Sequence, residues 1–361
     1  HINIFLEFKI IYNFIKLKDD NTYMARCLEL AKKGAGYVSP NPMVGCVIVY
    51  ENKIIGEGYH QKYGDHHAEV NAIKSVNEQN LLSKSTLYVN LEPCAHFGNT
   101  PPCCEYIVSK KITKVVIGSK DTSKKVNGLG IKFLKEHNVK VKLDVLSKQC
   151  IDLNKRFFNF QKNKIPYIIL KWAETKDGFI DVIREKNNKG INWITNESTK
   201  LLVHQWRSEE DAILVGRKTV ENDNPKLTVR KVDGKNPIRI VLDPTLKLKT
   251  SFNVFDSSSK TIVVNQSTDK EFKNLQYLKT SDKYMIDELL KYLFTQNITS
   301  IIIEGGKHTL NSFIEKNYWN EARVIVGDTI FNKGLKSPSL NKDWSIKKDL
   351  EKDVLYTYFN D

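Results

Sequence analysis

A histidine and two cysteines stand at spacings that suit a zinc site. His67 is followed two residues later by Glu69, and Cys94 and Cys103 come about a strand and a helix further along the chain. Catalytic zinc is commonly held by three such ligands, with the fourth position left to water. Glu69 could not ligate the metal without closing that position, so it is better placed to move protons for the bound water. We therefore predict that His67, Cys94 and Cys103 bind one zinc ion per chain and that Glu69 is catalytic.

The order of these residues narrows the chemistry. A His-x-Glu followed by Pro-Cys and a second cysteine is typical of zinc-dependent nucleobase deaminases, in which zinc hydroxide attacks an amino-bearing ring carbon. The two cysteines are usually three positions apart in that pattern, whereas Cys94 and Cys103 are nine apart. A lone cysteine is more often a small core residue than a ligand. All the pieces occur in order within one domain-sized stretch, which favours the metal site.

Length and composition indicate a two-domain globular protein. The chain has 361 residues, of which 40% are hydrophobic and 27% charged, enough for two cores. Its six cysteines are too few and too scattered for a secreted disulfide framework, which indicates a reducing, cytoplasmic compartment. Residues 1–19 carry an apolar run that Glu7, Lys9 and Lys16 interrupt, unlike a membrane span or a signal peptide. We interpret them as an N-terminal extension without an assigned function, and we expect no membrane association.

The formal net charge of +14 raises the question of a nucleic-acid partner. The excess is mostly lysine spread along the chain without a dense block, which is more typical of a solvated surface than of a binding groove. We therefore expect no nucleic-acid partner. The same charge would modestly favour anionic, phosphorylated substrates.

Residues 20–148 are predicted to form an α/β domain in which helices sandwich a mixed sheet. The expected helices are 22–33, 67–76, 103–110 and 130–137, and the expected strands are 44–50, 53–60, 86–90, 114–119 and 140–143. The first two strands should form a hairpin that turns at Glu51 and Asn52. Both cysteine ligands should lie at or near a helix N-terminus, where the helix dipole favours thiolates.

A polar and basic segment, residues 149–165, is expected to be a linker to a second domain at 166–361. The expected strands there are 167–172, 212–216, 238–243, 261–265, 300–304 and 322–326, and the expected helices are 196–207, 287–296 and 309–315. The strand ending at Ile303 runs into Gly305 and Gly306 before a helix. Such an arrangement suits phosphate binding, although glycine pairs at helix starts are often mere turns.

Several motifs are similar to those of one enzyme family. Glu92-Pro93-Cys94, with His96, Gly98 and Thr100-Pro101-Pro102-Cys103 after it, resembles the deaminase half of bifunctional riboflavin-biosynthesis deaminase/reductases. Segments that resemble the family's linker and reductase half are Leu153 to Phe158, Lys176-Asp177-Gly178, Trp193-Ile194-Thr195, residues 211–230 and Ile303 to Gly306. The resemblance implies a cytidine-deaminase-like α/β/α sandwich followed by a dihydrofolate-reductase-like α/β domain.

The resemblance also implies two reactions and their cofactors. The first is zinc-dependent hydrolytic deamination of 2,5-diamino-6-ribosylamino-4(3H)-pyrimidinone 5′-phosphate. The second is NADPH-dependent reduction of the ribosyl group of 5-amino-6-(5-phosphoribosylamino)uracil to ribityl. Asn41 and His60 are candidates for holding the pyrimidine in the deaminase. The implied NADPH contacts are Ala173, Trp193, Thr219, Asp223, Gly306, Lys307, His308, Thr309, Leu310, Asn311 and Ser312, and the implied reductase substrate contacts are Ile191, Arg207, Leu227, Arg230 and Glu304.

Simpler interpretations stay open beside these. Arg207 could be a surface helix residue, and Trp193 could be a core residue. The loop from Ile180 to Ile191 is expected to be longer than is usual for the family. A competing hypothesis for the whole chain is a nucleic-acid or nucleoside zinc deaminase with an inactive or binding-only C-terminal domain. Assembly into a homo-oligomer is left open.

Overall fold

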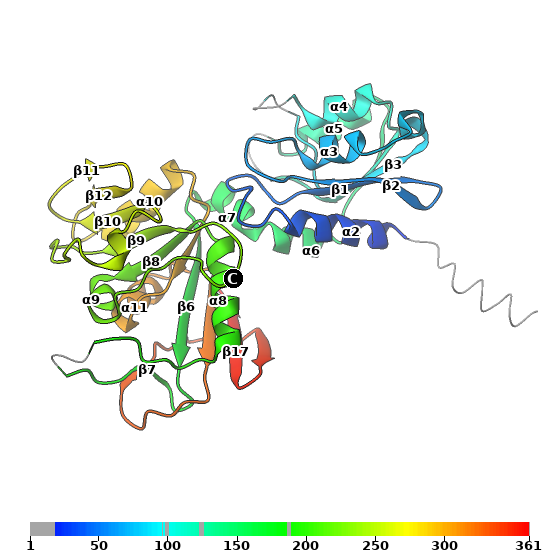
Figure 1. Cartoon of the computed structure of the whole chain (residues 1–361). Coiled ribbons are helices and arrows are strands. Elements are labelled where there is room, and N and C mark those ends of the chain that lie inside the picture. The colour runs from blue at the N-terminus through cyan, green and yellow to red at the C-terminus, as the bar shows by residue number, and fades with distance from the viewer. Residues whose placement is uncertain (1–18, 96, 98–100, 123–125, 186–188, 361) are drawn as a thin grey trace, which may run out of the picture. The chain divides into compact units, whose positions relative to one another are not determined.

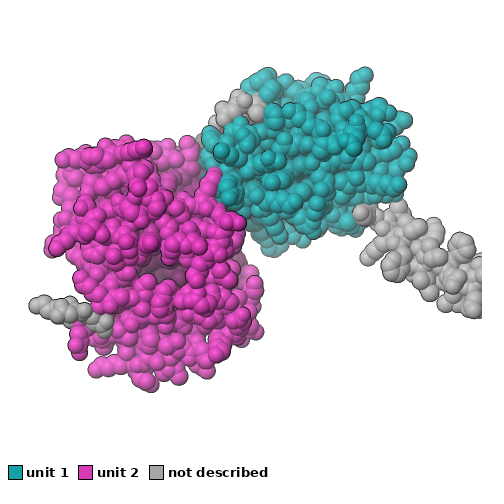
Figure 2. Space-filling model, in the orientation of Figure 1, with its two compact units in different colours: residues 1–162 teal, residues 163–361 magenta. Residues whose placement is uncertain are grey.

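The chain forms two compact units, which divide between Lys162 and Asn163 and are coloured separately in Figure 2. The computed structural model describes residues 19–95, 97, 101–122, 126–185 and 189–360. Of the expected N-terminal extension, residues 1–18 lie outside the described residues. Asp19 is described, and its carboxylate accepts a hydrogen bond from the N–H of Thr22, so it caps the first described helix.

The first unit is built on a five-stranded sheet with the order β2-β1-β3-β4-β5. The strands are β1 (Gly45–Tyr50), β2 (Lys53–Tyr59), β3 (Thr86–Leu91), β4 (Lys114–Ser119) and β5 (Lys140–Lys142). Strands β2, β1 and β3 are antiparallel neighbours, whereas β3, β4 and β5 run parallel. The predicted hairpin turn is confirmed: Glu51 and Asn52 both have positive φ angles, as a tight two-residue hairpin turn requires.

Helices cover both faces of this sheet (Figure 1). They are α2 (Asp20–Lys32), α3 (Ala68–Lys74), α4 (Cys103–Ser109), α5 (Leu129–Glu136) and α6 (Ser147–Leu153), with a short 3-10 helix at Gln79–Lys84. Helix α7 (Lys155–Asn163) follows α6 in the chain. Alternate residues of β1 enter opposite cores. Cys46 and Ile48 pack with α3, α4 and α5, whereas Val47 and Val49 pack with α2 and Cys150 of α6. The predicted α/β/α sandwich is therefore present.

The segment expected to be a linker is largely helical. Helices α6 and α7 occupy most of residues 149–165, and the described structure divides only after Lys162. Cys150 is fully buried in the core of the first unit, and Asn154 is buried in the same unit. The polar and basic composition concealed these two buried residues, because a short helix needs to bury only one face.

The second unit contains a ten-stranded sheet with the order β11-β12-β10-β9-β8-β13-β6-β14-β17-β16. The strands are β6 (Tyr167–Glu174), β8 (Ala212–Gly216), β9 (Ile238–Leu242), β10 (Thr261–Asn265), β11 (Lys270–Glu271), β12 (Leu275–Lys279), β13 (Ser300–Ile303), β14 (Glu321–Val326), β16 (Ile346–Leu350) and β17 (Asp353–Phe359). Strands β7 (Phe179–Asp181) and β15 (Leu335–Lys336) pair separately. From β12 to β14 the neighbours are parallel, and β17 and β16 continue the sheet antiparallel.

Helices again pack on both faces of the sheet. They are α8 (Glu197–Glu209), α9 (Arg217–Asp223), α10 (Met285–Thr295) and α11 (Lys307–Glu315), with a 3-10 turn at Asn253–Phe255. Residues of α10 and α11 share a core with one face of the sheet, whereas residues of α8 and α9 pack on the other face. In the described part of the chain, no helix combines the length and the apolarity needed to cross a bilayer.

Candidate active sites

Three elements of the first unit deliver the predicted zinc ligands. His67 is the N-cap residue of α3, Cys94 follows the end of β3, and Cys103 is the first residue of α4. The backbone N–H of Cys104 donates to the carbonyl of Cys94 at 3.2 Å, which joins the loop to the helix start. Residues that are far apart in the sequence are thereby brought to one place by a strand end and two helix starts.

The separations of the ligand atoms fit zinc. His67 Nδ1 lies 3.2 Å from Cys103 Sγ and 3.6 Å from Cys94 Sγ, and all three ligand atoms lie within 4.8 Å of one another. With Zn–S near about 2.3 Å and Zn–N near about 2.1 Å, tetrahedral geometry places nitrogen and sulfur about 3.6 Å apart. One imidazole and two thiolates are also donors that zinc prefers. The predicted cluster can therefore hold the metal.

The two sulfurs differ in how readily they ionise. The backbone N–H of Cys103 donates to Cys94 Sγ at 3.3 Å, so the helix start faces this sulfur as predicted. Contact with the Cys103 thiol and with the His67 ring lowers the pKa of Cys94 to about 4. The adjacent Cys94 thiolate and burial raise the pKa of Cys103. Metal binding would displace the proton that this pair retains.

Glu69 lies in the first turn of α3 and is only 3% exposed. Burial raises its pKa, and the charge of the His67 ring opposes that shift. The carboxyl group also contacts Cys103, which places it beside the candidate metal. A carboxyl group with a raised pKa next to a reactive centre is suited to accept and return a proton.

His60 and Asn41 lie beside the candidate metal site. The His60 and His67 rings meet edge to face with centroids 5.4 Å apart. His60 Nδ1 is 3.1 Å from the His66 carbonyl oxygen, and His60 Nε2 is 3.1 Å from Asn41 Nδ2. Because a carbonyl can only accept, Nδ1 carries the proton and Nε2 accepts from the Asn41 amide. Burial lowers the pKa of His60, which keeps the ring neutral, and the amide oxygen of Asn41 points away from it.

Glu92 fixes the backbone next to the Cys94 loop by hydrogen bonding, although we predicted no role for it from the sequence. Its buried carboxylate accepts hydrogen bonds from the N–H groups of Asp121, Gly128 and Ile131, each at 3.2 Å. These contacts tie the end of β3 to the start of α5. The available signal was an acidic residue directly before Pro93-Cys94, since an acid that the fold buries there needs several donors.

A buried charged cluster surrounds Glu304 in the second unit. Arg207 Nε donates to Glu304 Oε1 at 3.1 Å and Arg207 Nη2 to Oε2 at 2.7 Å, while Lys171 Nζ lies 4.0 Å from Oε2. Burial opposes ionisation of Glu304, but Arg207 and Lys171 outweigh it and lower its pKa to about 2. The interpretation of Arg207 as a surface helix residue is therefore wrong. Lys171 was missed, and the signal was a lysine inside an otherwise apolar predicted strand.

Arg230 and His204 adjoin this cluster. The backbone N–H of Arg230 donates to His204 Nδ1 at 3.1 Å, and its guanidinium donates to Thr228 Oγ1 at 2.7 Å. Burial, together with the charges of Arg207 and Arg230, lowers the pKa of His204 to about 4. Burial and the nearby Arg207 also lower the pKa of Arg230. Three cations against one carboxylate leave an excess of positive charge that suits a phosphorylated ligand.

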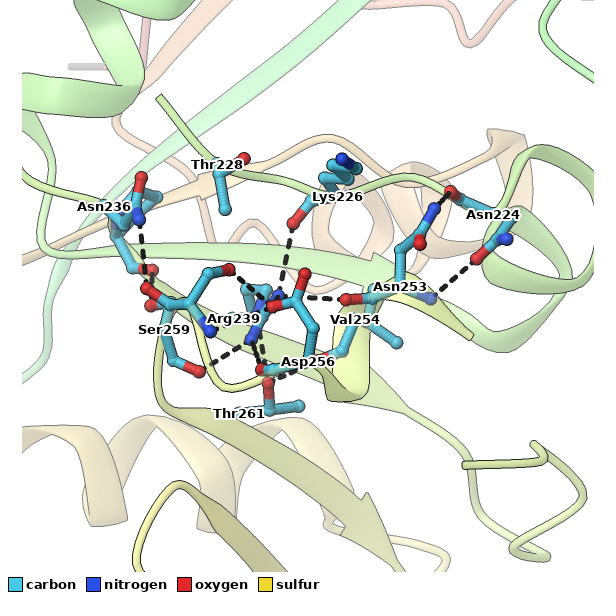
Figure 3. A network of polar contacts seen from close by, with 12 residues as sticks. Asn224, Lys226, Thr228, Asn236, Arg239, Asn253, Val254, Asp256, Ser259 and Thr261 are labelled. Carbon is cyan, nitrogen blue, oxygen red and sulfur yellow. Dashed lines mark hydrogen bonds and ion pairs between the residues drawn. The ribbon is translucent and has the colours of Figure 1, made fainter. Parts of the chain in front are cut away.

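A buried arginine on β9, Arg239, binds the backbone of the segment that leads to Arg230. Figure 3 shows Arg239, which is fully buried, reaching the loop segments around it. Its guanidinium donates to the carbonyl oxygens of Lys226 (3.4 Å), Asn253 (3.1 Å) and Ser259 (2.6 Å), to Asp256 Oδ1 (2.8 Å) and to Thr261 Oγ1 (3.0 Å). All three guanidinium nitrogens are therefore engaged by backbone and side-chain acceptors within the fold rather than facing a ligand.

Leu227 can meet a ligand only through its backbone. Its side chain is buried in the cluster that contains Val220, Val241 and Val254, and its φ of 55° is unusual for leucine. Arg239 holds the Lys226 carbonyl, and the trans peptide then points the Leu227 N–H in the opposite direction. The predicted substrate contact at Leu227 is thereby limited to its peptide groups.

The glycine-rich turn after β13 brings several predicted cofactor residues together. Gly306 is the N-cap of α11, and its N–H donates to Thr219 Oγ1 at 3.2 Å. A Cβ atom at Gly305 would lie 2.6 Å from Thr309 Cβ, so the backbone there must lack a side chain. The turn sits at the carboxyl ends of parallel strands β8 and β13, where α/β folds bind ligands, and a helix start suits phosphate.

The remaining members of the predicted cofactor set differ in their surroundings. Leu310 packs in the core beneath α11, so its side chain cannot contact a cofactor. Lys307, His308, Asn311 and Ser312 lie on the same helix, and Ala173 is half-buried on β6. Trp193 is 58% exposed, with Lys200 Nζ 3.6 Å from its ring centroid, so its interpretation as a core residue is wrong.

A second ion-pair cluster joins Asp223 to the loop of residues 180–191. Arg184 Nη2 lies 3.0 Å from Asp223 Oδ1, and Arg184 Nε lies 2.6 Å from Asp181 Oδ2. Burial raises the pKa of Asp223 to about 6 while Arg184 opposes that shift. Ile191, which was predicted to contact substrate, is exposed in this loop and has no charged group of its own to offer. No pattern in the sequence pointed to the pairing of Arg184 with Asp223, because the two residues are 39 positions apart in the chain.

Comparisons with known proteins agree with this two-unit architecture. Residues 17–119 match the family described as the cytidine and deoxycytidylate deaminase zinc-binding region. Residues 166–349 match the family described as the RibD C-terminal domain. The two matches fall on the two units, and neither region overlaps the other.

Relatives and solved structures match along most of the chain. The riboflavin biosynthesis protein RibD of Aquifex aeolicus is 38% identical over 88% of this chain and 89% of its own length. That of Escherichia coli is 31% identical over 88% and 85%. A Thermotoga maritima diaminohydroxyphosphoribosylaminopyrimidine deaminase/5-amino-6-(5-phosphoribosylamino)uracil reductase superposes with a TM-score of 0.85 at 33% identity, covering 94% of this chain and 97% of that one. RibD of Acinetobacter baumannii gives 0.84 at 27% identity, over 95% and 99%.

Proposed function

This chain belongs to the family of bifunctional riboflavin-biosynthesis deaminase/reductases, and from that premise we propose how its residues carry out the two reactions. It is a zinc-dependent deaminase and an NADPH-dependent reductase in one chain. The deaminase hydrolyses the ring amino group of 2,5-diamino-6-ribosylamino-4(3H)-pyrimidinone 5′-phosphate. The reductase converts the ribosyl group of 5-amino-6-(5-phosphoribosylamino)uracil to ribityl. The competing hypothesis of a nucleic-acid deaminase is set aside, because it leaves the reductase match of residues 166–349 unexplained.

In the deaminase, His67, Cys94 and Cys103 hold zinc, which is supported by ligand atoms within 4.8 Å of one another. Zinc bound there would lower the pKa of a coordinated water toward about 7 and so would supply a nucleophile at neutral pH. Glu69 accepts a proton from this water and returns it to the departing ammonia. Its burial beside Cys103 supports that role, since a pKa raised toward neutral pH suits a carboxyl group that must both accept and donate a proton.

Asn41 and His60 hold the pyrimidine ring in this proposal. The neutral His60 ring accepts from the Asn41 amide, which fixes the amide and directs its oxygen away from His60. That oxygen is an acceptor suited to a ring N–H or amino group of the substrate. Asn41 and His60 are both neutral, so they can orient the pyrimidine ring without adding a charged group that could bind the metal.

In the reductase, Arg207 and Arg230 bind the substrate phosphate together with the peptide N–H of Leu227. Glu304 orients Arg207 through the two hydrogen bonds between them. NADPH held nearby would supply the hydride that reduces C1′ of the sugar, and that chemistry belongs to the cofactor. Thr219, Asp223 and the start of α11 hold the cofactor, and the exposed Trp193 ring offers a stacking face. The excess of positive charge around Glu304 supports the assignment of the substrate phosphate to Arg207 and Arg230.

The observation that most directly supports the proposal is the zinc-ligand cluster of His67, Cys94 and Cys103, with Glu69 beside it. Zinc-loaded protein supplied with the diaminopyrimidinone phosphate and NADPH should release ammonia first and then oxidise NADPH. A chelator should stop ammonia release, whereas NADPH oxidation with the deaminated pyrimidine should continue. Ammonia release from cytidine or from single-stranded DNA, with none from the pyrimidine phosphate, would contradict the proposal.

We also propose a cytoplasmic location and no nucleic-acid partner. All six cysteines are free thiols, and two of them must stay reduced to bind zinc. The sites described above use residues of one chain, and light scattering of the purified protein would decide whether it forms a homo-oligomer.

A further inference from the structure

Asn154 lies between α6 and α7, in the segment that the sequence suggested was a linker. Its side chain is buried in the first unit, at 2% exposure. Asn154 Oδ1 accepts from the backbone N–H of Met43 at 2.8 Å, and Nδ2 donates to the Met43 carbonyl at 2.9 Å. One amide thus satisfies both polar backbone groups of a residue that is 111 positions away. Side chain–backbone pairing of this kind fixes a backbone position that no helix or strand holds.

Met43 is also tied to the strand that leads to the zinc site. Asn90, on β3, donates to the Met43 carbonyl at 3.1 Å and accepts from the N–H of Gly45 at 2.8 Å. Strand β3 ends at Leu91, three residues before Cys94. The backbone at Met43 is therefore held between Asn154 on one side and the strand that delivers a zinc ligand on the other.

The residues on either side of Met43 contact His60. The Asn41 amide lies 3.1 Å from His60 Nε2, and the Val44 carbonyl accepts from the His60 N–H at 2.9 Å. The His60 ring is in turn 5.4 Å from the ring of His67. A shift of the Met43 backbone would therefore move both contacts of His60 and the amide of Asn41 relative to the zinc ligands.

We propose that Asn154 is a positioning residue of the deaminase site, which sets Asn41 and His60 in place through Met43. The inference rests on the proposed role of Asn41 and His60 in holding the pyrimidine. Asparagine suits this position because its short amide presents a donor and an acceptor side by side. An ionised aspartate keeps the acceptor and loses the donor, and leucine offers neither. The junction of α6 and α7 is then part of the deaminase rather than a spacer.

The test uses Asn154→Asp and Asn154→Leu in the full-length, zinc-loaded chain. In Asn154→Leu the KM for the diaminopyrimidinone phosphate should rise about tenfold, a size expected when a substrate-orienting group is misplaced. Asn154→Asp should raise KM less, because Met43 N–H keeps its acceptor. The kcat of deamination should fall less than KM rises, since Glu69 and the metal ligands stay in place. Zinc content and the reductase kcat/KM should match the wild type.

Asp152→Ala is the matched control, since Asp152 lies on α6, two residues before Asn154, and pairs with Lys148 at the surface. It should leave both activities unchanged. An unchanged KM in both Asn154 variants, or loss of zinc from both, would make Asn154 a folding residue and overturn the inference. Absence of deamination by the wild-type protein under the same conditions would instead overturn the proposed function itself, so the two failures can be told apart.

Discussion

Cys103 and Cys104 are neighbours on α4 but lie in different surroundings. Cys103 Sγ is 3.2 Å from His67 Nδ1, whereas Cys104 packs in the apolar core beneath α3 and α4. Burial raises the pKa of Cys104 to about 12, which is typical of an inert structural thiol. Successive helical residues point about 100° apart, so only one of the two can face the metal.

We expect Cys94→Ser and Cys103→Ser to lose the zinc, because a neutral hydroxyl is a poor substitute for a thiolate ligand. Cys104→Ser should keep about one zinc per chain, with at most a modest loss of stability from the buried hydroxyl. Metal analysis of the three purified variants is the measurement. Loss of zinc from Cys104→Ser together with retention in Cys103→Ser would show that the wrong sulfur has been assigned.

His204 should make the second unit less stable as the pH falls. Its pKa is lowered to about 4 in the fold, chiefly by burial, against about 6.5 in the unfolded chain. The folded state therefore binds fewer protons, so its stability is full above about pH 6.5 and falls as the pH drops toward 4. By linkage, the loss between pH 7.5 and pH 5 is about 2 kcal/mol.

His204→Gln removes this dependence while offering an acceptor to the Arg230 N–H. The free energy of unfolding should be measured for both proteins at the two pH values by tryptophan fluorescence, which reports the second unit because all five tryptophans lie there. The difference between wild type and His204→Gln should narrow by about 2 kcal/mol at the lower pH. A difference that does not depend on pH would mean that folding does not lower the pKa of His204.

At the scale of elements, Arg239 links β9 to the segments around Lys226, Asn253 and Ser259 (Figure 3). Arg239→Met should destabilise the second unit by about 3–5 kcal/mol, because several buried carbonyls and the Asp256 carboxylate would lose their donor. Tryptophan fluorescence during denaturation measures this loss. Ser259→Ala is the control, since it keeps the backbone carbonyl that Arg239 binds, and it should cost much less.

The sequence was sufficient to predict the elements whose pattern is local. The β1–β2 hairpin follows from apolar runs around Glu51-Asn52, and strand β8 from an uninterrupted apolar run between Asp211 and Gly216. The zinc ligands were predictable because the family motif fixes their order. Strand β17 was missed, although its inward residues alternate, because no turn residue or motif drew attention to it.

Contacts between distant residues could not be predicted in the same way. Nothing near Asn154 in the sequence points to Met43, and nothing near Arg184 points to Asp223. A polar residue in a basic segment is more often solvated than buried, so composition favoured a linker where the structure has α6 and α7. Side-chain partners of this kind follow from the folded topology, which local periodicity does not specify.

For the whole molecule, the two units perform successive reactions on one phosphorylated compound. The product of deamination is the substrate of the reductase, so a single chain supplies the two catalysts in equal amounts. The net charge of +14 favours binding of the substrate in both units, because both substrates are anionic phosphates. Each unit nevertheless keeps its own chemistry, with metal ligands in the first and a cationic cluster around Glu304 in the second.

Glu69→Gln tests this separation of chemistries. Glutamine preserves the size of the side chain and its hydrogen bonding but cannot accept a proton and then return it. We expect deamination to fall by roughly a hundredfold to ten-thousandfold, the usual contribution of general acid–base catalysis. Zinc content should stay near one per chain, because Glu69 is not among the three clustered ligand residues.

The same preparation provides the control for that variant. NADPH oxidation with supplied 5-amino-6-(5-phosphoribosylamino)uracil should proceed at the wild-type rate, because the residues proposed for that step all lie in the second unit. Loss of both activities together would point to misfolding rather than to chemistry. Deamination near the wild-type rate would mean that Glu69 only orients a zinc ligand, in which case the water proton must leave by a different group and the proposed mechanism of the first unit fails.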